Sequence, residues 1–196
     1  MVRNVVSGSI LTMLLIGIST MALKITLVEA DQTIIHVGDL IIDGNQTFLI
    51  ENCTYVQTGD IVVKDNATLL IGDSKLILNL TMNYEYSILA HDNATILSQN
   101  STITTPTRLV FDIHFFEGSH GLFKYSNVSL HGDIGGFGHS LISIVSSQAF
   151  EVRSYEYSNV IIRNSSLWGA SSIAWEMSFP QVYSNMLTQD HLSLLS

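Results

Sequence analysis

Apolar and polar residues alternate along most of the chain after residue 30, and three stretches repeat the same order of them. These stretches are "LIIDGNQTFLIENCTYVQ" from Leu40, "IVVKDNATLLIGDSKLIL" from Ile61 and "ILAHDNATILSQNSTITT" from Ile88. The three align without a gap over their whole length, and the second step between their starts is longer than the first. Each reads as an apolar strand, a polar turn with Asn, a second strand, a second turn and a third strand.

Equivalent positions of the three stretches form columns of similar residues. Three apolar columns hold Phe48, Leu69 and Ile96, then Ile50, Ile71 and Ser98, then Tyr55, Leu76 and Ile103. Alternate side chains of a strand point to one face, so we expect these columns to stack as a core. A column of small residues, Cys53, Ser74 and Ser101, fits an inward-pointing corner between two strands.

The repeat continues more loosely toward the C-terminus. We place Asn127 in register with Asn100, at the same step that separates Asn100 from Asp73, and we place Asn164 in the same column. The step from Asn127 to Asn164 is longer, which predicts an insertion of about ten residues in one coil, within "HGDIGGFGHS". After Trp168 the register is lost.

These patterns predict an all-β chain: a single-domain, right-handed parallel β-helix of about 5–6 coils over residues 31–196. The right hand follows from the general preference for that crossover. A β-sandwich is the competing fold, but it needs antiparallel hairpins with tight turns of the Asn-Gly type. Asp43-Gly44 is a single case of such a turn, and gapless repetition favours the solenoid.

The repeated pattern DNATL-x-I-x-(N/D)-S-x-(L/I)-x-L resembles the coils of right-handed parallel β-helices in pectate-lyase-like secreted proteins. The resemblance extends from Ile34 to about Leu167. It implies the architecture and a place among secreted or surface proteins, and it implies no particular activity.

Residues 1–30 read as a secretory signal peptide. Arg3 supplies a basic start, Ile10–Leu23 a short apolar segment, and Ala30 a small residue for cleavage. Cleavage predicts a secreted, extracellular or cell-surface protein. The alternative is an uncleaved N-terminal membrane anchor, although the segment is short beside the roughly 20 residues of a full span.

The net charge of the predicted mature chain argues against some classes of binding partner. The whole sequence has 8 basic and 17 acidic residues, and Arg3, Lys24 and Glu29 lie in the signal segment, which leaves a net charge near −10. No basic cluster is left, which argues against nucleic acid and anionic membranes. The one cysteine, Cys53, cannot form an internal disulfide and falls in the small inward column, where a buried, inert thiol is expected.

Eight N-glycosylation sequons are the densest motif in the chain. Their asparagines are Asn45, Asn52, Asn66, Asn79, Asn93, Asn100, Asn127 and Asn164. We expect some to carry glycans, with Asn66 and Asn93 the best candidates, if the host glycosylates secreted proteins. The alternative is that Asn serves the turn and Thr the strand, which creates sequons incidentally.

A stretch rich in histidine and acidic residues carries the weak candidates for chemistry: Asp112, His114, His120, Asp133 and His139. Imidazole and carboxylate groups are metal ligands and acid–base catalysts. Their spacing matches no metal or catalytic motif, and His120 falls in the turn column of Asn66 and Asn93. A structural role for these residues is therefore the competing interpretation, and we predict no metal or cofactor.

The element "GSHG" around His120 resembles one in β-helix polygalacturonases. Those enzymes also need paired aspartates and a basic motif for the acidic sugar, and this sequence has no Asp-Asp pair and no Arg-x-Lys element. Pectate lyase chemistry would need calcium held by a carboxylate cluster. Arg108, Arg153 and Arg163 are available as the basic group, but without acidic companions at a recognisable spacing.

Large aromatic and aliphatic side chains suggest further binding or packing surfaces. The aromatic residues Tyr84, Tyr86, Phe115, Phe116, Tyr155, Tyr157, Trp168 and Trp175 can bind sugars by stacking or can fill a core and shield an end. Leu49, Leu70 and Leu97 form an outward apolar column, which predicts a covering segment or a partner. End-to-end or lateral self-association is a further option, because the pattern stops without an evident C-terminal cap.

We therefore predict a secreted or cell-surface module with a structural, adhesive or glycan-binding role, and polysaccharide or cell-envelope components as partners. The alternative is a polysaccharide lyase or glycoside hydrolase of the pectate-lyase-like type, which rests on the resemblance in fold. Calcium enters only under the lyase alternative. Convergence of three or more of the candidate acidic and histidine side chains within a groove on one sheet would favour the enzyme, and scatter over separate turns would exclude it.

Overall fold

The computed structural model describes residues 32–129, 131–168, 174–175, 181–183 and 186–187. Within these residues the protein is all-β, with 22 strands and no helix. No helix long and apolar enough to span a membrane occurs in this part of the chain. The predicted signal segment, residues 1–30, lies outside the described residues. The strands belong to the unit Asp31–Ser196 and form a parallel solenoid of about six turns, as predicted.

Three parallel sheets build the solenoid, and every strand pairs with the strands three places before and after it. Sheet A contains β1 (Gln32–Val37), β4 (Cys53–Thr58), β7 (Lys75–Leu78), β10 (Thr102–Thr104), β13 (Asn127–Val128), β16 (Gln148–Ala149), β19 (Ser166–Leu167) and β22 (Met186–Leu187). Sheet B contains β2 (Leu40–Ile42), β5 (Ile61–Val63), β8 (Ser87–Ala90), β11 (Phe111–Phe115), β14 (Gly132–Gly136), β17 (Glu151–Tyr155) and β20 (Ala174–Trp175).

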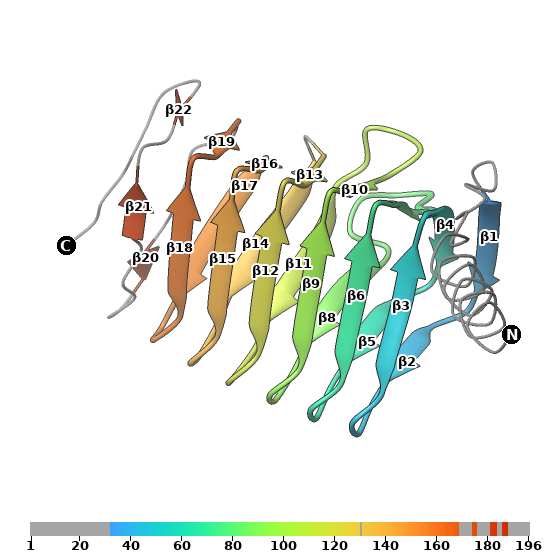
Figure 1. Ribbon diagram of the computed structural model, residues 1–196, viewed down its shortest axis with the longest axis horizontal. Coiled ribbons are helices and arrows are strands. Elements are labelled where there is room, and N and C mark those ends of the chain that lie inside the picture. Colours follow the sequence, from blue (N-terminus) through green and yellow to red (C-terminus); the bar gives the residue numbers. More distant parts are fainter. Residues whose placement is uncertain (1–31, 130, 169–173, 176–180, 184–185, 188–196) are drawn as a thin grey trace, which may run out of the picture. The chain divides into compact units, whose positions relative to one another are not determined.

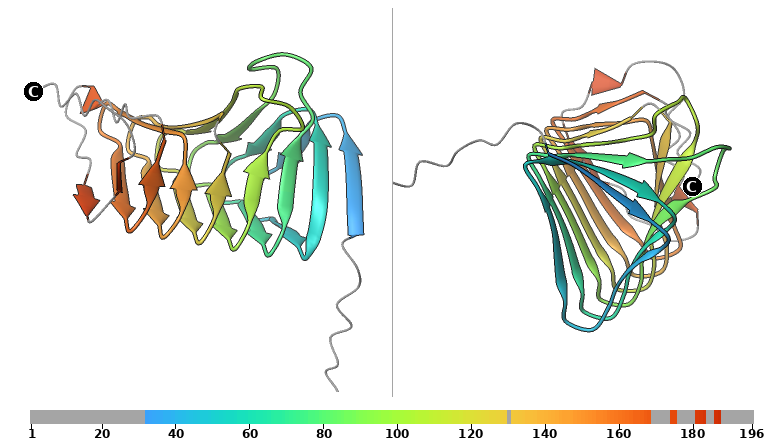
Figure 2. Two further views of the ribbon diagram at one scale, coloured as in Figure 1. Left: turned by 90° about the horizontal axis from the view of Figure 1, so that it is seen from above. Right: turned by 90° about the vertical axis from the view of Figure 1, so that its right-hand side faces the viewer.

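Sheet C contains β3 (Thr47–Glu51), β6 (Thr68–Gly72), β9 (Thr95–Gln99), β12 (His120–Lys124), β15 (Leu141–Val145), β18 (Asn159–Arg163) and β21 (Gln181–Tyr183). Each coil passes from sheet B to sheet C and then to sheet A. The strands of sheet C stand side by side along the solenoid in Figure 1, and the end-on view in Figure 2 shows the sheets around a common interior. Longer connections follow β7 and β10, between sheets A and B.

The core consists of the predicted columns. Phe48 pairs with Leu69 and Leu69 with Ile96, while Tyr55 pairs with Leu76 and Leu76 with Ile103. Most of these side chains are fully buried, because strand alternation turns them inward and each coil covers the one before it. The outward column of Leu49, Leu70 and Leu97 is also in register, and Leu49 at its end is exposed.

The corner between sheets C and A carries a ladder of serines. Its side chains are Cys53, Ser74, Ser101, Ser126, Ser147 and Ser165, and all are buried. The backbone N–H of each member donates to the next serine Oγ, from Cys53 to Ser74 (3.2 Å) through to Ser147 to Ser165 (3.2 Å). Each serine Oγ also donates to the carbonyl two residues before it, so buried polar groups at the corner are satisfied.

The residue before each corner serine has a positive φ, which turns the chain sharply. Asn100 (φ 50°) and Asn164 (φ 49°) occupy this position, as asparagine tolerates the left-handed region, but Tyr125 (φ 51°) and Ser146 (φ 49°) occupy it too. At the corner between sheets B and C the left-handed residue is Asp65 (φ 60°), one place before the predicted Asn66. Asn66 still joins a ladder, because Asn93 Nδ2 donates to its Oδ1 at 3.4 Å.

The predicted register is wrong at Asn127 but right at Asn164, which directly precedes a corner serine as Asn100 does. Asn127 pairs with Thr102, not with Asn100, because the third step between corner serines is 25 residues, from Ser101 to Ser126. The shift of two residues still leaves Phe123 on its predicted inward face. The long step from Asn127 to Asn164 contains no insertion: "HGDIGGFGHS" includes strand β14, which belongs to a complete coil of its own. Coils of 21 and 18 residues follow Ser126.

Candidate functional site

Polar side chains cluster on the outer face of sheet B, where β11, β14 and β17 lie side by side. Parallel pairing places Asp112 beside Asp133 and Asp133 beside Glu151. Two residues further along the same strands, His114 pairs with Gly135 and Gly135 with Arg153. Because every second side chain shares a face, acidic residues form one row and the imidazole and guanidinium groups form the next.

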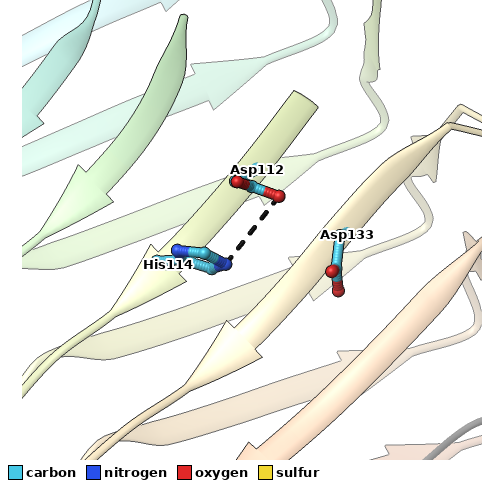
Figure 3. Close-up of side chains that lie close together, drawn as sticks. All are labelled: Asp112, His114 and Asp133. Atoms are coloured by element: carbon cyan, nitrogen blue, oxygen red, sulfur yellow. Dashed lines mark ion pairs between the residues drawn. The ribbon is translucent and has the colours of Figure 1, made fainter. Parts of the chain in front are cut away.

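Asp112, His114 and Asp133 converge at the centre of this cluster (Figure 3). One ligand atom from each, two carboxylate oxygens and an imidazole nitrogen, lie within 4.8 Å of one another. His114 Nε2 lies 3.9 Å from Asp112 Oδ1. Asp133 is the most buried of the three, with 8% of its side chain exposed, against 20% for Asp112 and 24% for His114.

Arg153 joins the cluster from β17. Its Nη1 lies 3.0 Å from Asp133 Oδ2, and its Nη2 lies 2.9 Å from Glu151 Oε1. The second carboxylate oxygen of Asp133, Oδ1, is buried and accepts no hydrogen bond from the described residues. The guanidinium therefore neutralises only part of the acidic row, and one buried carboxylate oxygen is left unsatisfied.

Burial dominates the electrostatics of the site. It raises the pKa of Asp133 to about 6, although the Arg153 guanidinium opposes the rise. Burial also raises the pKa of Asp112 and lowers the pKa of His114, because desolvation disfavours each charged form. For Arg153, burial alone would lower the pKa, but the neighbouring carboxylates raise it. Asp133 can thus hold a proton near neutral pH while Arg153 stays charged, which suits acid–base work.

A row of aromatic rings borders the cluster. His91, Phe116, Phe137 and Tyr155 stack along the solenoid, with centroid distances of 4.7, 5.1 and 4.6 Å and interplanar angles of 7°, 15° and 4°. His114 contacts Phe116 and Phe137 edge-on, at 6.0 and 5.2 Å. The rings of this row pack face to face against one another, so only the rings at its two ends have a face free to stack on a sugar. The row also fixes the position of His114 and stabilises the sheet.

A groove of about 500 Å³ lies elsewhere, beside the loop that follows β10. Thr104, Pro106 and Arg108 line it from the loop side, and Asn127, Gln148 and Trp168 line it from the later coils. His131 also contributes to the wall. Trp168 is 49% exposed, and its backbone N–H donates to the Ala149 carbonyl (3.2 Å), which fixes its position against sheet A. The groove therefore combines one large aromatic ring with amides, hydroxyls and a single guanidinium.

The structure brings together three of the five predicted candidates. His120 and His139 are exposed and lie outside the cluster. His120 pairs with Thr95 at the start of β12, so its predicted place in the turn column of Asn93 is wrong by two residues. Phe115 is fully buried, which agrees with a core role. The Cys53 thiol is buried.

The sequence interpretation missed Glu151, Phe137 and the groove. Glu151 and Arg153 lie one coil beyond Asp133, and the wrong register hid their position beside it. All eight sequon asparagines are exposed, including Asn127 in the groove wall. Exposure permits glycosylation at each of them, and their use stays a prediction. The side chain of Trp175 lies outside the described residues.

No protein-family model, curated protein or solved structure matches this chain.

Proposed function

We propose that this chain is an extracellular glycan-binding solenoid and that it binds a short stretch of neutral glycan in the groove beside Trp168. The observation that carries the proposal is the lining of the groove. An exposed indole ring offers an apolar face for a sugar ring, and the Asn127 and Gln148 amides offer donors and acceptors for hydroxyl groups. Its volume of about 500 Å³ lies within the usual range for small-molecule pockets.

Charge supports a neutral ligand over a polyanion. Arg108 is the only lysine or arginine among the groove residues, and the sequence carries a formal net charge of −9. Such a surface repels polyanions at long range. The dense sequons and the N-terminal apolar segment support export, with cleavage after Ala30, and the pectate-lyase-like resemblance of the repeat is consistent with this setting.

Binding to an array of neutral and acidic oligosaccharides tests the proposal. We expect a neutral oligosaccharide to bind and Trp168→Ala and Gln148→Ala each to weaken its affinity by about tenfold or more. Tyr157→Ala is the matched control, because Tyr157 is 52% exposed and lies outside the groove. Absence of binding, or equal loss in the control, would contradict the proposal.

Asn127 adds an internal test. Its side chain lines the groove, so a glycan attached there would fill the space that the ligand needs. We expect the exported protein to carry no glycan at Asn127. Mass spectrometry of the secreted protein shows which sequons carry a glycan, and it also identifies the N-terminal residue after cleavage.

A second candidate function is cleavage of a polysaccharide at sheet B. The convergence of Asp112, His114 and Asp133 beside Arg153 favours it, since carboxyl groups with separated roles carry out glycoside chemistry. Incubation with polygalacturonate and with neutral polysaccharides, with and without calcium, tests this function. New reducing ends or unsaturated products that disappear in Asp133→Asn would establish it, and inactivity on all substrates would leave the binding function alone.

A further inference from the structure

Three side chains of sheet B, Asp112, His114 and Asp133, converge on one point of its outer face. Their ligand atoms come from two adjacent strands and lie within 4.8 Å of one another. Zinc–ligand distances are about 2.0–2.2 Å for nitrogen and oxygen, so small side-chain rotations bring these atoms into a coordination sphere. The parallel register fixes the two strands relative to each other and presents the atoms on one face.

An unsatisfied oxygen supplies independent evidence for a ligand. Asp133 is over nine-tenths buried, and its Oδ1 accepts no hydrogen bond from the described residues, while Oδ2 is bound by Arg153. Buried carboxylate oxygens are rarely left without a partner, because the desolvation cost is then uncompensated. A cation beside Oδ1 would remove that cost.

The position of His114 is built for such a contact. Gly135 lies opposite it on β14, and a Cβ at Gly135 would come within 2.8 Å of His114 Cδ2 and 3.2 Å of Nε2. The ring can therefore lie over β14, toward Asp133, only because residue 135 has no side chain. Phe116 and Phe137 hold the same ring edge-on and fix its orientation.

The local charge also favours a cation. Asp112, Asp133 and Glu151 supply three carboxylates, and Arg153 forms ion pairs with Asp133 and Glu151. Among these side chains the carboxylates outnumber the guanidinium, which favours a divalent cation beside them.

We propose that Asp112, His114 and Asp133 bind a divalent transition-metal ion, for which Zn²⁺ is the reference, with water completing the coordination. One imidazole and two carboxylates suit zinc and its neighbours, whereas calcium and magnesium prefer ligand sets made only of oxygen. The site uses residues other than the groove residues and is independent of the proposed glycan binding.

Titration of the full-length chain with Zn²⁺ after chelator treatment tests this site. Isothermal titration should show one Zn²⁺ per chain, with a rise in Tm on binding. His114→Gln and Asp133→Asn should each weaken binding by at least tenfold. His120→Gln and His139→Gln are matched controls, since both histidines are exposed and lie outside the cluster, and they should leave the stoichiometry and affinity unchanged.

Two further measurements keep the test decisive. Co²⁺ in place of Zn²⁺ should give visible absorption bands that His114→Gln alters, and this variant changes a half-buried ring with little risk to folding. Excess Ca²⁺ and Mg²⁺ should not displace the ion. Absence of stoichiometric binding, binding that survives both ligand substitutions, or displacement by Ca²⁺ would overturn the proposal.

Discussion

The outer face of sheet B changes character halfway along the solenoid, although the strands pair in one continuous register. One outward column reads Ile41, Val62 and Leu89 in the first half and His114, Gly135 and Arg153 in the second. The neighbouring inward column reads Leu40, Ile61, Ile88, Ile113, Ile134 and Val152 throughout. Apolar residues thus persist in this inward column, whereas the outward column becomes polar in the second half, which we call the polar half.

This difference separates the determinants of fold from those of chemistry. The inward columns and the corner serines bury each coil against the next, so their residue types are constrained in both halves. Outward positions lie outside the core, and the stacked strands bring their side chains together without a cost to it. Four predictions test this separation, from the largest expected effect to the smallest.

Residues of the inward column should contribute similarly to the free energy of unfolding in both halves of the solenoid. Ile88→Ala and Ile113→Ala each create a cavity at a fully buried position, and we expect each to lower the free energy of unfolding by about 2–5 kcal/mol. Their outward neighbours, Leu89→Ala and His114→Ala, should cost less, since both side chains are only partly buried. Urea unfolding measures all four, and a negligible cost at Ile113 would show that the polar half is loosely packed.

The corner ladder should matter equally in the two halves. Ser101→Ala in the first half and Ser147→Ala in the second each remove an Oγ that accepts a backbone N–H and donates to a carbonyl. We expect a loss of about 1–3 kcal/mol for each, because buried backbone groups lose their partner. Thermal unfolding measures both variants, and Lys75→Ala is the control, because Lys75 is exposed and its truncation should cost little stability. A loss in the control equal to that of the serine variants would contradict the prediction.

A side chain added at Gly135, in the outward column of the polar half, should destabilise the protein and displace its neighbour. Gly135→Ala places a Cβ within 2.8 Å of His114 Cδ2, so we expect a loss of about 1–2 kcal/mol and displacement of the His114 ring. Gly72→Ala in the first half is the control, because its Cβ would meet nothing within 4 Å. Unfolding by urea and the histidine NMR signals report the two effects; identical behaviour of the two variants would contradict the prediction.

The polar half should also make stability depend on pH. The pKa of Asp133 is about 6 in the folded chain against an ordinary value of 3.8, so the folded state binds its proton more tightly than the unfolded state. The resulting stabilisation is present below about pH 4 and is lost as pH rises through about 6. In chelator-treated protein, Asp133→Asn should flatten the fall in the free energy of unfolding across this window, and an unchanged slope would contradict the prediction.

Much of the fold could be read from the repeat, because gapless recurrence of Leu69, Ser74 and Leu76 in neighbouring coils specifies both the columns and the corner. The predicted register failed at Asn127, where the coil length changed to 25 residues, and the two coils of 21 and 18 residues that follow were taken for one coil with an insertion. Asparagine was the wrong marker there, since a left-handed turn also accepts Tyr125 and Ser146. The corner serines are the more reliable marker, because from Ser74 to Ser165 a buried hydroxyl satisfies two backbone groups in each coil.

The candidate site was predicted only in part. Asp112, His114 and Asp133 were named from their residue types, but nothing in their spacing separated them from His120 and His139, which lie elsewhere. Strand pairing makes residues one coil apart neighbours, and the length of a coil varies along the chain. Local patterns therefore cannot show which of these side chains meet.

The sequence by itself determined the inner face of this protein: alternation and repetition require stacked parallel strands with small residues at one corner. The tertiary structure alone decided what the outer face can do. It paired β11 with β14 and β14 with β17, which placed Asp133 between Asp112 and Arg153, and it formed a groove from a loop and Trp168. Burial is specified by local periodicity, whereas a site depends on which coils become neighbours and on how long each coil is.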